Sequence, residues 1–316
     1  MGYELYFRAR QHAGMDEARF LDYFQHRPCY QVQDGQAWYV NEATGVDFCF
    51  TLTPLPDALA PRDGHYPVVL HIGYLRPDYL IQEVEPEVTA FVRCFELQVA
   101  DPQAGGMGEG EYDPILLVSG WNSGNELAYA AMLQHGSLGS IYHLPSLQLR
   151  RIWRWNYRRA ERQERLGSAT LVPEIQMREH EGTVITVVEW PDGCAAIIPP
   201  ADYLLIPRTR LAPRRWWRAE PDCTLVEWKQ MAPLLQLHGQ HEVDGAIALQ
   251  YRQIPRSLEK MIRRLAPGVL NGGLLKPAQI LTRELVHPEL LPVASETDKG
   301  ALLPDKLIKM SKINKI

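Results

Sequence analysis

The sequence has little cysteine and no long apolar run. Its cysteines lie far apart and are odd in number, which argues against a disulfide framework or a zinc knuckle; they are Cys29, Cys49, Cys94, Cys194 and Cys223. Reduced thiols in a core are the expected alternative. No stretch approaches the ~18 apolar residues of a membrane span, and the first residues do not form a signal-peptide pattern. We therefore expect a reducing compartment, the cytoplasm.

Positive charge is also in short supply. The 316 residues carry 33 Lys and Arg against 38 Asp and Glu, a formal net charge of −5. A surface that binds nucleic acid needs clustered Lys and Arg to displace counterions from phosphates. General nucleic-acid binding is therefore not expected, and any such hypothesis requires a local basic patch. The hydrophobic content of 46% is ordinary for a globular chain with one large or two modest cores.

The motifs of familiar enzyme classes are missing. The sequence contains no P-loop, no Gly-x-Ser-x-Gly and no His-Glu-x-x-His. The glycines of 105–110 superficially resemble a dinucleotide-binding loop, but acidic residues and a proline follow where a helix should open. His238 and His241 have a spacing that suits a metal on a helix, yet Gly239 interrupts it and two ligands do not make a zinc site. We expect no catalytic residue, no metal and no cofactor.

A metal-dependent nuclease is the main enzymatic alternative. Nucleases of restriction-endonuclease fold hold Mg²⁺ with an Asp at the start of one strand and a Glu-x-Lys on its neighbour. Asp192, followed by Glu227 and Lys229, fits that outline. However, Pro191-Asp192-Gly193 is typical of a tight turn, which would point the Asp192 carboxylate into solvent. We therefore expect that the protein is not an enzyme.

Alternating periodicities predict an α+β fold with two largely antiparallel sheet units and packed helices. The clearest local signal is a hairpin, in which strands 30–33 and 37–40 flank Asp34-Gly35. The other elements expected in the first unit are strands at 3–9, 46–50, 68–74, 97–99 and 115–119, helices at 16–26, 86–95 and 125–133, and a glycine-rich loop at 105–110.

The second half begins with a basic helix and continues as a β-meander. Expected strands lie at 174–180, 183–190, 194–198, 203–206 and 224–227. We predict an N-terminal α+β domain at 1–148, a bridging helix and meander domain at 149–240, and a helical extension with a lysine-rich tail at 241–316. Five of the eight lysines lie in the last eighteen residues, which is typical of an exposed end of the chain.

The basic segment allows two interpretations. Residues 150–165 carry seven arginines against two glutamates. Trp153, Arg154 and Tyr157 could stack on nucleic-acid bases. Alternatively, the apolar residues of the segment could hold a helix between the two units while the arginines face water, which is the commoner role of a charged helix face.

Negative charge is concentrated between Asp78 and Asp113. Nine acids against Arg93 give this segment a net charge of −8, and such a field can steer a basic partner. The acids near Pro86 could instead complement a helix N-terminus, but those beyond residue 100 fall in a predicted loop with no such role. The candidate partner-binding residues, including two possible aromatic anchors, are Glu83, Glu85, Glu87, Asp101, Glu109, Glu111, Tyr112, Asp113 and Trp121.

Several short motifs occur in a characteristic order. They are Trp38-Tyr39, Asn41-Glu42, Thr44-Gly45-Val46-x-Phe48, Gly120-Trp121 with Asn122 and Asn125, Trp153-x-Trp155-Asn156-Tyr157, and Val172-Pro173. Over residues 3–237 the chain resembles bacterial polymorphic-toxin immunity proteins, specifically those encoded beside toxins of restriction-endonuclease fold, including type VI secretion nuclease effectors. The resemblance implies a cytoplasmic inhibitor that binds its toxin and has no catalytic residues.

That implication agrees with the charge pattern. A nuclease presents a positively charged cleft, and an acidic protein surface can occupy it in place of phosphates. The expected partner is a nuclease toxin, with no nucleic acid, membrane or small-molecule substrate bound directly. A secretion-system adaptor or chaperone is the other binding function consistent with the sequence.

Overall fold

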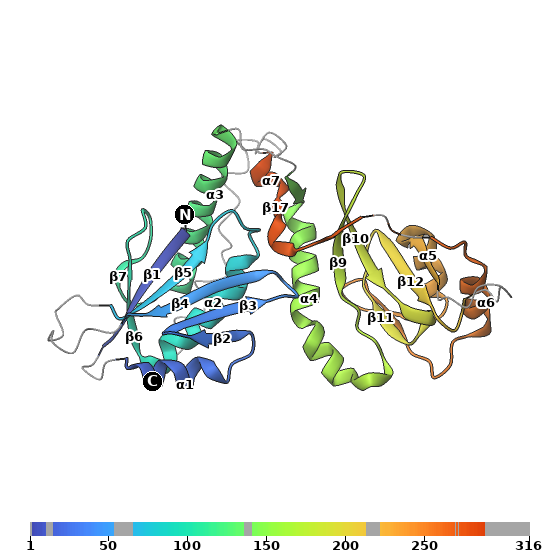
Figure 1. The fold of residues 1–316 in the computed structure, drawn as a ribbon, viewed down its shortest axis with the longest axis horizontal. Helices are drawn as coiled ribbons and strands as arrows, with labels where there is room; N and C mark the ends of the chain where they lie inside the picture. The colour runs from blue at the N-terminus through green and yellow to red at the C-terminus, as the bar shows by residue number, and fades with distance from the viewer. Residues whose placement is uncertain are drawn as a thin grey trace, which may run out of the picture.

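The computed structural model of the protein describes residues 2–10, 15–53, 66–135, 141–212, 222–268, 270 and 272–287. It has an α+β fold built from two units, with a long helix between them (Figure 1). The fold class predicted from the sequence is therefore confirmed. The lysine-rich tail lies outside the described residues.

The first unit is a sheet in strand order β2-β3-β4-β5-β1-β6-β7, with each neighbouring pair antiparallel. Its strands are β1 (Gly2–Ala9), β2 (Tyr30–Gln33), β3 (Gln36–Asn41), β4 (Val46–Leu52), β5 (Val68–Gly73), β6 (Leu97–Asp101) and β7 (Gly108–Gly110). The helices α1 (Glu17–Gln25), α2 (Leu80–Phe95) and α3 (Pro114–Gln134) pack on one face. Along β1 that face buries Tyr3, Leu5 and Phe7, while alternate side chains stay partly exposed.

The predicted hairpin is confirmed. Asp34 and Gly35 connect β2 to β3 with φ values of 51° and 73°, and both positive values suit the tight turn that an Asp-Gly pair favours. Pairing of Tyr30 with Tyr39 and of Gln33 with Gln36 sets the register. The local turn chemistry therefore decides this part of the fold.

Two predictions in the first unit are wrong. The expected strand at 115–119 and helix at 125–133 are one helix, α3, and part of the expected glycine loop is the edge strand β7. The Asp113 carboxylate caps α3 by accepting from the backbone N–H groups of Ile115 and Leu116, and Pro114 occupies the first turn. With that cap, Leu117, Trp121 and the residues after them face the sheet at helical spacing.

The bridging helix α4 (Ser146–Leu166) leads into the second unit through η1 (Gly167–Ala169). One sheet there has the order β13-β12-β10-β9-β16, and a smaller sheet has the order β11-β15-β14. The strands are β9 (Ile175–His180), β10 (Thr183–Glu189), β11 (Ala196–Ile198), β12 (Tyr203–Arg208), β13 (Asp222–Glu227), β14 (Gln240–His241), β15 (Ile247–Leu249) and β16 (Leu274–Leu275). The helices are η2 (Pro191–Gly193), α5 (Trp228–Gln236), α6 (Arg256–Arg264) and η3 (Pro277–Gln279).

The chain then returns to the first unit. Strand β17 (Ile280–Thr282) pairs in parallel with β8 (Tyr142–Leu144), and α7 (Arg283–Val286) follows. The Glu284 carboxylate accepts from the backbone N–H of Ser146 at 2.9 Å, at the start of α4. The domain boundary expected at residue 240 falls inside β14. This strand pairs with β15, which pairs in turn with β11 of the second unit. One hydrophobic core runs through both units, from Tyr3 to Ile280.

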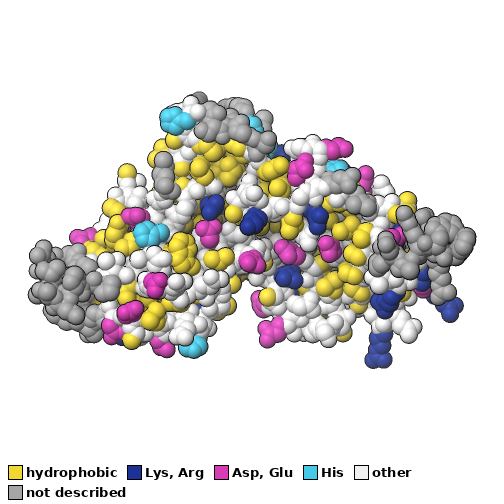
Figure 2. Space-filling model, viewed as in Figure 1, with side chains coloured by type: hydrophobic (Ala, Val, Ile, Leu, Met, Phe, Trp, Pro, Cys, Tyr) yellow, Lys and Arg dark blue, Asp and Glu magenta, His cyan; other side chains and the backbone are white. Residues whose placement is uncertain are grey.

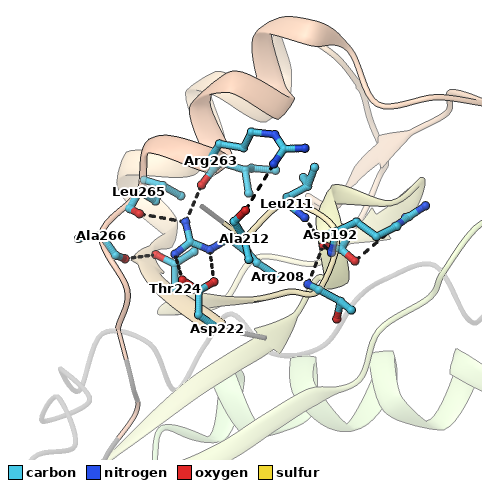
Figure 3. Close-up of polar contacts among 12 residues, drawn as sticks. Asp192, Arg208, Leu211, Ala212, Asp222, Thr224, Arg263, Leu265 and Ala266 are labelled. Carbon is cyan, nitrogen blue, oxygen red and sulfur yellow. Dashed lines mark hydrogen bonds and ion pairs between the residues drawn. The ribbon is translucent and has the colours of Figure 1, made fainter. Parts of the chain in front are cut away.

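A buried arginine holds α6 to the second sheet (Figure 3). Arg208 is fully buried; its Nε and Nη2 donate to the two Asp222 oxygens at 2.7 and 2.8 Å. Its Nη1 donates to the carbonyl oxygens of Ile262 and Leu265, at the end of α6. One guanidinium therefore neutralises a carboxylate and satisfies two helix-terminal carbonyls.

We expect Arg208→Lys to destabilise the protein, although the charge is retained. Lysine lacks the planar fork that serves Asp222 and both carbonyls together, and each buried acceptor left without its donor costs about 1–3 kcal/mol. Urea unfolding followed by circular dichroism measures the change. Arg252→Lys at an exposed position is the control and should stay within about 0.5 kcal/mol of the parent. Equal stability of the two variants would contradict this role of Arg208.

A histidine pair closes the β8–β17 junction. Arg283 Nε donates to His143 Nδ1 at 3.4 Å, and the Nε2 atoms of His143 and His287 lie 3.2 Å apart. Because Nδ1 of His143 accepts, its proton sits on Nε2 and is donated to His287. Burial, followed by the charges of His287 and Arg283, lowers the pKa of His143. The folded state therefore favours the neutral ring.

Stability should fall as the pH drops past about 6.5, the ordinary value for histidine. The unfolded chain binds the His143 proton more tightly than the folded one, so this contribution is complete above that pH and is lost below it. We expect the melting temperature to fall more between pH 7.5 and pH 5.5 for the parent than for His143→Gln, which cannot titrate. Parallel pH profiles for the two proteins would exclude the histidine pair as the cause.

Candidate partner-binding surface

The structure divides the nine predicted partner-binding residues into an interior group and a surface group. Glu83, Asp101 and Trp121 are buried. The other six lie at or near the surface around the β6–β7 edge and α2; they are Glu85, Glu87, Glu109, Glu111, Tyr112 and Asp113. Only this second group can contact a partner directly.

Glu83 is the centre of a buried hydrogen-bond network. Its Oε1 accepts from the Tyr39 hydroxyl at 2.7 Å, Asn41 Nδ2 at 2.7 Å and Thr44 Oγ1 at 3.2 Å, and its Oε2 accepts from Trp153 Nε1 at 2.7 Å. The pKa of Tyr39 is raised, first by burial and then by the adjacent carboxylate. The prediction of Glu83 as a surface acid is wrong because α2 turns this position toward β3 and α4.

Asp101 and Trp121 also have interior roles. The Asp101 carboxylate accepts from the Tyr3 hydroxyl and from the backbone N–H groups of Gln103 and Met107, the latter two at 3.1 Å. It therefore shapes the β6–β7 hairpin and does not stand in a free loop, as the sequence suggested. Trp121 is fully buried and its Nε1 donates to the Gly73 carbonyl at 3.3 Å. It belongs to the core and cannot serve as an anchor.

Within the surface group, two of the acids also support the fold. Asp113 caps α3, and Glu87 accepts from Arg27 at 2.7 Å with only 22% of its side chain exposed. Glu109 and Glu111 are the most available acids. Glu109 accepts from the Tyr66 hydroxyl at 2.5 Å, and Glu111 pairs with Arg10 while its side chain stays 67% exposed. Exposed pairs of this kind contribute little to stability and can exchange partners readily.

A groove lies beside these acids, between the end of α2, β6 and the start of α3. Its volume is about 610 Å³. The apolar lining comes from Val92, Leu97, Tyr112 and Pro114. The charged lining comes from Arg10, Arg93, Glu96 and Glu111. The groove thus combines apolar contact area with charged groups that can orient a ligand.

Helix α3 carries exposed apolar side chains at its start, next to the groove, and again about three turns later. Ile115, Leu116 and Leu127 are 76%, 39% and 72% exposed, and Figure 2 shows hydrophobic side chains gathered over α3 near the top of the view. Exposed apolar side chains at the rim of a groove are typical of an interaction site. The predicted strand at 115–119 and helix at 125–133 place these side chains on two separate elements, so this surface was not predicted from the sequence.

The nuclease-like triad is not brought together. Asp192 accepts from the backbone N–H groups of Thr209, Arg210 and Leu211, just after β12 (Figure 3). Glu227 pairs with Tyr203 at the start of β12. At ~3.3 Å per residue, the backbone beside Glu227 and the backbone beside Asp192, at opposite ends of β12, lie about 20 Å apart. Asp192 is also buried, contrary to the prediction that it faces solvent. Among the described residues, no group of three or more His, Cys, Asp and Glu could hold a metal.

The motifs that carry the family resemblance are largely structural. Tyr39, Asn41 and Thr44 bind Glu83. Asn156 donates to the Ala43 and Ile175 carbonyls, and its Oδ1 accepts from the Ile175 N–H. These residues fasten α4 to both units. Their role in this structure is therefore to position elements of the fold.

No family model, curated protein or solved structure matches this chain. No helix among the described residues is long and apolar enough to cross a membrane.

All five cysteines are free. Cys29 and Cys94 are exposed, so the expectation that all five would be core thiols is wrong for these two.

We expect Glu83→Ala to destabilise the protein by about 3–5 kcal/mol. The change leaves four donors without their acceptor, two of them on the buried residues Tyr39 and Thr44, and each unsatisfied buried group costs about 1–3 kcal/mol before relaxation. Urea unfolding measures the loss. Glu85→Ala, in the same helix but partly exposed, is the matched control and should change stability by about 0.5 kcal/mol or less. An equal loss of unfolding free energy in the two variants would show that the Glu83 network does not stabilise the fold.

Proposed function

We propose that this protein is an immunity-type inhibitor that binds a secreted nuclease toxin and neutralises it in the cytoplasm of the producing cell. The observation that carries the proposal is the exposed acidic edge of the first sheet beside the groove. Glu109 and Glu111 project there with Glu96, next to an apolar lining. A nuclease cleft built for phosphates is basic, and such an edge is complementary to it.

The groove defines what the partner would place there. Its charged lining contains two glutamates and two arginines, and Arg10 already pairs with Glu111. A lysine or arginine of the partner could displace Arg10, while an apolar neighbour contacts Tyr112 and Val92. The exposed Ile115 and Leu116 extend the apolar contact beyond the groove. Buried aromatic and apolar contacts supply affinity, and the acids supply orientation and association rate.

Variants that test this surface must replace exposed acids that do not also support the fold. Asp113 caps α3, so replacing it confounds binding with stability. Glu96, Glu109 and Glu111 are exposed, and their replacement by Lys should spare the fold. Glu126, Glu164 and Glu242 are equally exposed acids elsewhere. Their replacement by Lys gives a control with the same change in net charge.

The experiment begins with capture of partners by the tagged chain from the source strain. We expect a protein whose cleavage of plasmid DNA is blocked by one equivalent of this chain. The Glu96→Lys, Glu109→Lys, Glu111→Lys variant should associate more slowly and protect less, and the control triple should match the parent. Raising salt should narrow the gap, because screening shortens the ~10 Å reach of charge at 0.1 M.

Two outcomes would overturn the proposal. The first is capture of partners without nuclease activity, which would favour an adaptor or chaperone. The second is cleavage of DNA or RNA by the purified chain with Mg²⁺ or Mn²⁺, abolished by Glu227→Ala, which would restore the nuclease alternative.

A further inference from the structure

The outer face of α4 carries arginines without carboxylate partners. Three of the seven arginines of this helix are paired, Arg150 with Asp78, Arg162 with Asp244 and Arg165 with Glu161. Arg151, Arg154 and Arg158 are exposed and, within the described part of the chain, form no ion pair. Their spacing of three and four residues places them on one face over about 10 Å of helix. This face is opposite the side that buries Leu149, Ile152 and Asn156.

A stack of three aromatic rings ends beside these arginines. Buried Tyr79 lies under Trp153, with centroids 5.9 Å apart and an interplanar angle of 12°. Trp153 lies under Tyr157, with 5.7 Å between centroids and an angle of 29°. Hydrogen bonds fix the lower rings, from Trp153 Nε1 to Glu83 and from the Tyr79 hydroxyl to the Thr44 carbonyl. Tyr157 is 45% exposed, so the stack presents a positioned ring at the surface.

We propose that this face of α4 binds single-stranded nucleic acid, with a base stacked on Tyr157 and phosphates held by Arg151, Arg154 and Arg158. An unpaired base continues a ring stack that the protein has already ordered, and guanidinium groups match phosphate oxygens in pairs. A duplex keeps its bases stacked on one another and cannot use Tyr157. An acidic protein segment would satisfy the arginines but gains no stacking contact.

The local charge permits this ligand although the chain is acidic overall. Glu87 and Glu161, two acids near this face, are paired with Arg27 and Arg165. Glu83, the other acid of α2 that acts on Tyr157, is buried, and its oxygens accept four hydrogen bonds. The acidic β6–β7 edge lies at the far edge of the first sheet from β2 and β3, the strands on the α4 side (Figure 1). The inference is therefore independent of the proposed toxin inhibition, and purified chain with a synthetic oligonucleotide tests it.

The experiment is fluorescence anisotropy with a labelled single strand of about twelve nucleotides, within the usual site sizes of such proteins. Tyr157→Ala should weaken binding roughly tenfold, as loss of one base stack does, whereas Tyr157→Phe keeps the ring and should bind like the parent. Replacing Arg151, Arg154 and Arg158 by Gln should weaken binding. It should also reduce the slope of the logarithm of the association constant against the logarithm of the salt concentration by about 2, because each of the three lost phosphate contacts contributes ~0.7.

The matched control replaces Arg252, Arg256 and Lys260 by Gln, three exposed cations of the second unit. It removes the same charge and should bind like the parent. Thermal melts verify that every variant is folded, and the arginine variant, changed only at exposed positions, tests the surface if Tyr157→Ala does not fold.

Three results would overturn the inference. One is absence of binding by the parent at about 50 mM salt, where phosphate contacts are strongest. Another is an equal loss in the control, which would mean that only net charge matters. The last is unchanged binding by Tyr157→Ala together with equal competition by polyglutamate, which would assign the face to an acidic protein partner.

Discussion

The Glu83 carboxylate is the acceptor on which the arrangement of the two units depends. It lies on α2, and its four donors come from β3, the turn that follows β3, and α4. A charge buried without a cation is tolerable only when its oxygens are hydrogen-bonded. The network therefore selects one position of α4 against the first sheet. Because α4 also packs on the second unit through Asn156 and Trp155, that position is transmitted to both sheets.

The same network connects interior structure to surface chemistry. Trp153 uses one edge to bind Glu83 and one face to support Tyr157. The buried acid therefore fixes Trp153, the ring that supports Tyr157. At the opposite edge of the first sheet, Asp101 shapes the hairpin that displays Glu109. In both places a buried carboxylate positions an exposed group: Glu83 acts on Tyr157, and Asp101 acts on Glu109. The acidic segment thus contains acids that support the fold and acids that are available to a partner.

How much the sequence predicts depends on the range of the interactions. The β2–β3 hairpin follows from Asp34-Gly35 and adjacent strands, and the confirmed α+β class follows from the alternation of periods. The extent of α3 was missed because Gly120 and the polar residues around it interrupt the apolar pattern, although Tyr3 fits against that glycine. The prediction of Glu83 as a surface acid fails because its donors include Trp153, 70 residues away, and nothing local in the sequence indicates that contact. Charge density along the chain located the acidic edge but could not identify which acids point inward.

The return of the chain through β17 and α7 bears on how the protein is made. Ser146 at the start of α4 is bonded to Glu284, 138 residues later. A ribosome adding about 5–20 residues per second needs roughly 7–28 s to cover that interval. Throughout that time the nascent first unit lacks β17, and the bridging helix lacks the carboxylate that binds its N-terminus. The second unit must therefore emerge while its tether is incomplete, and the bond between Glu284 and Ser146 can form only when nearly the whole described chain has left the ribosome.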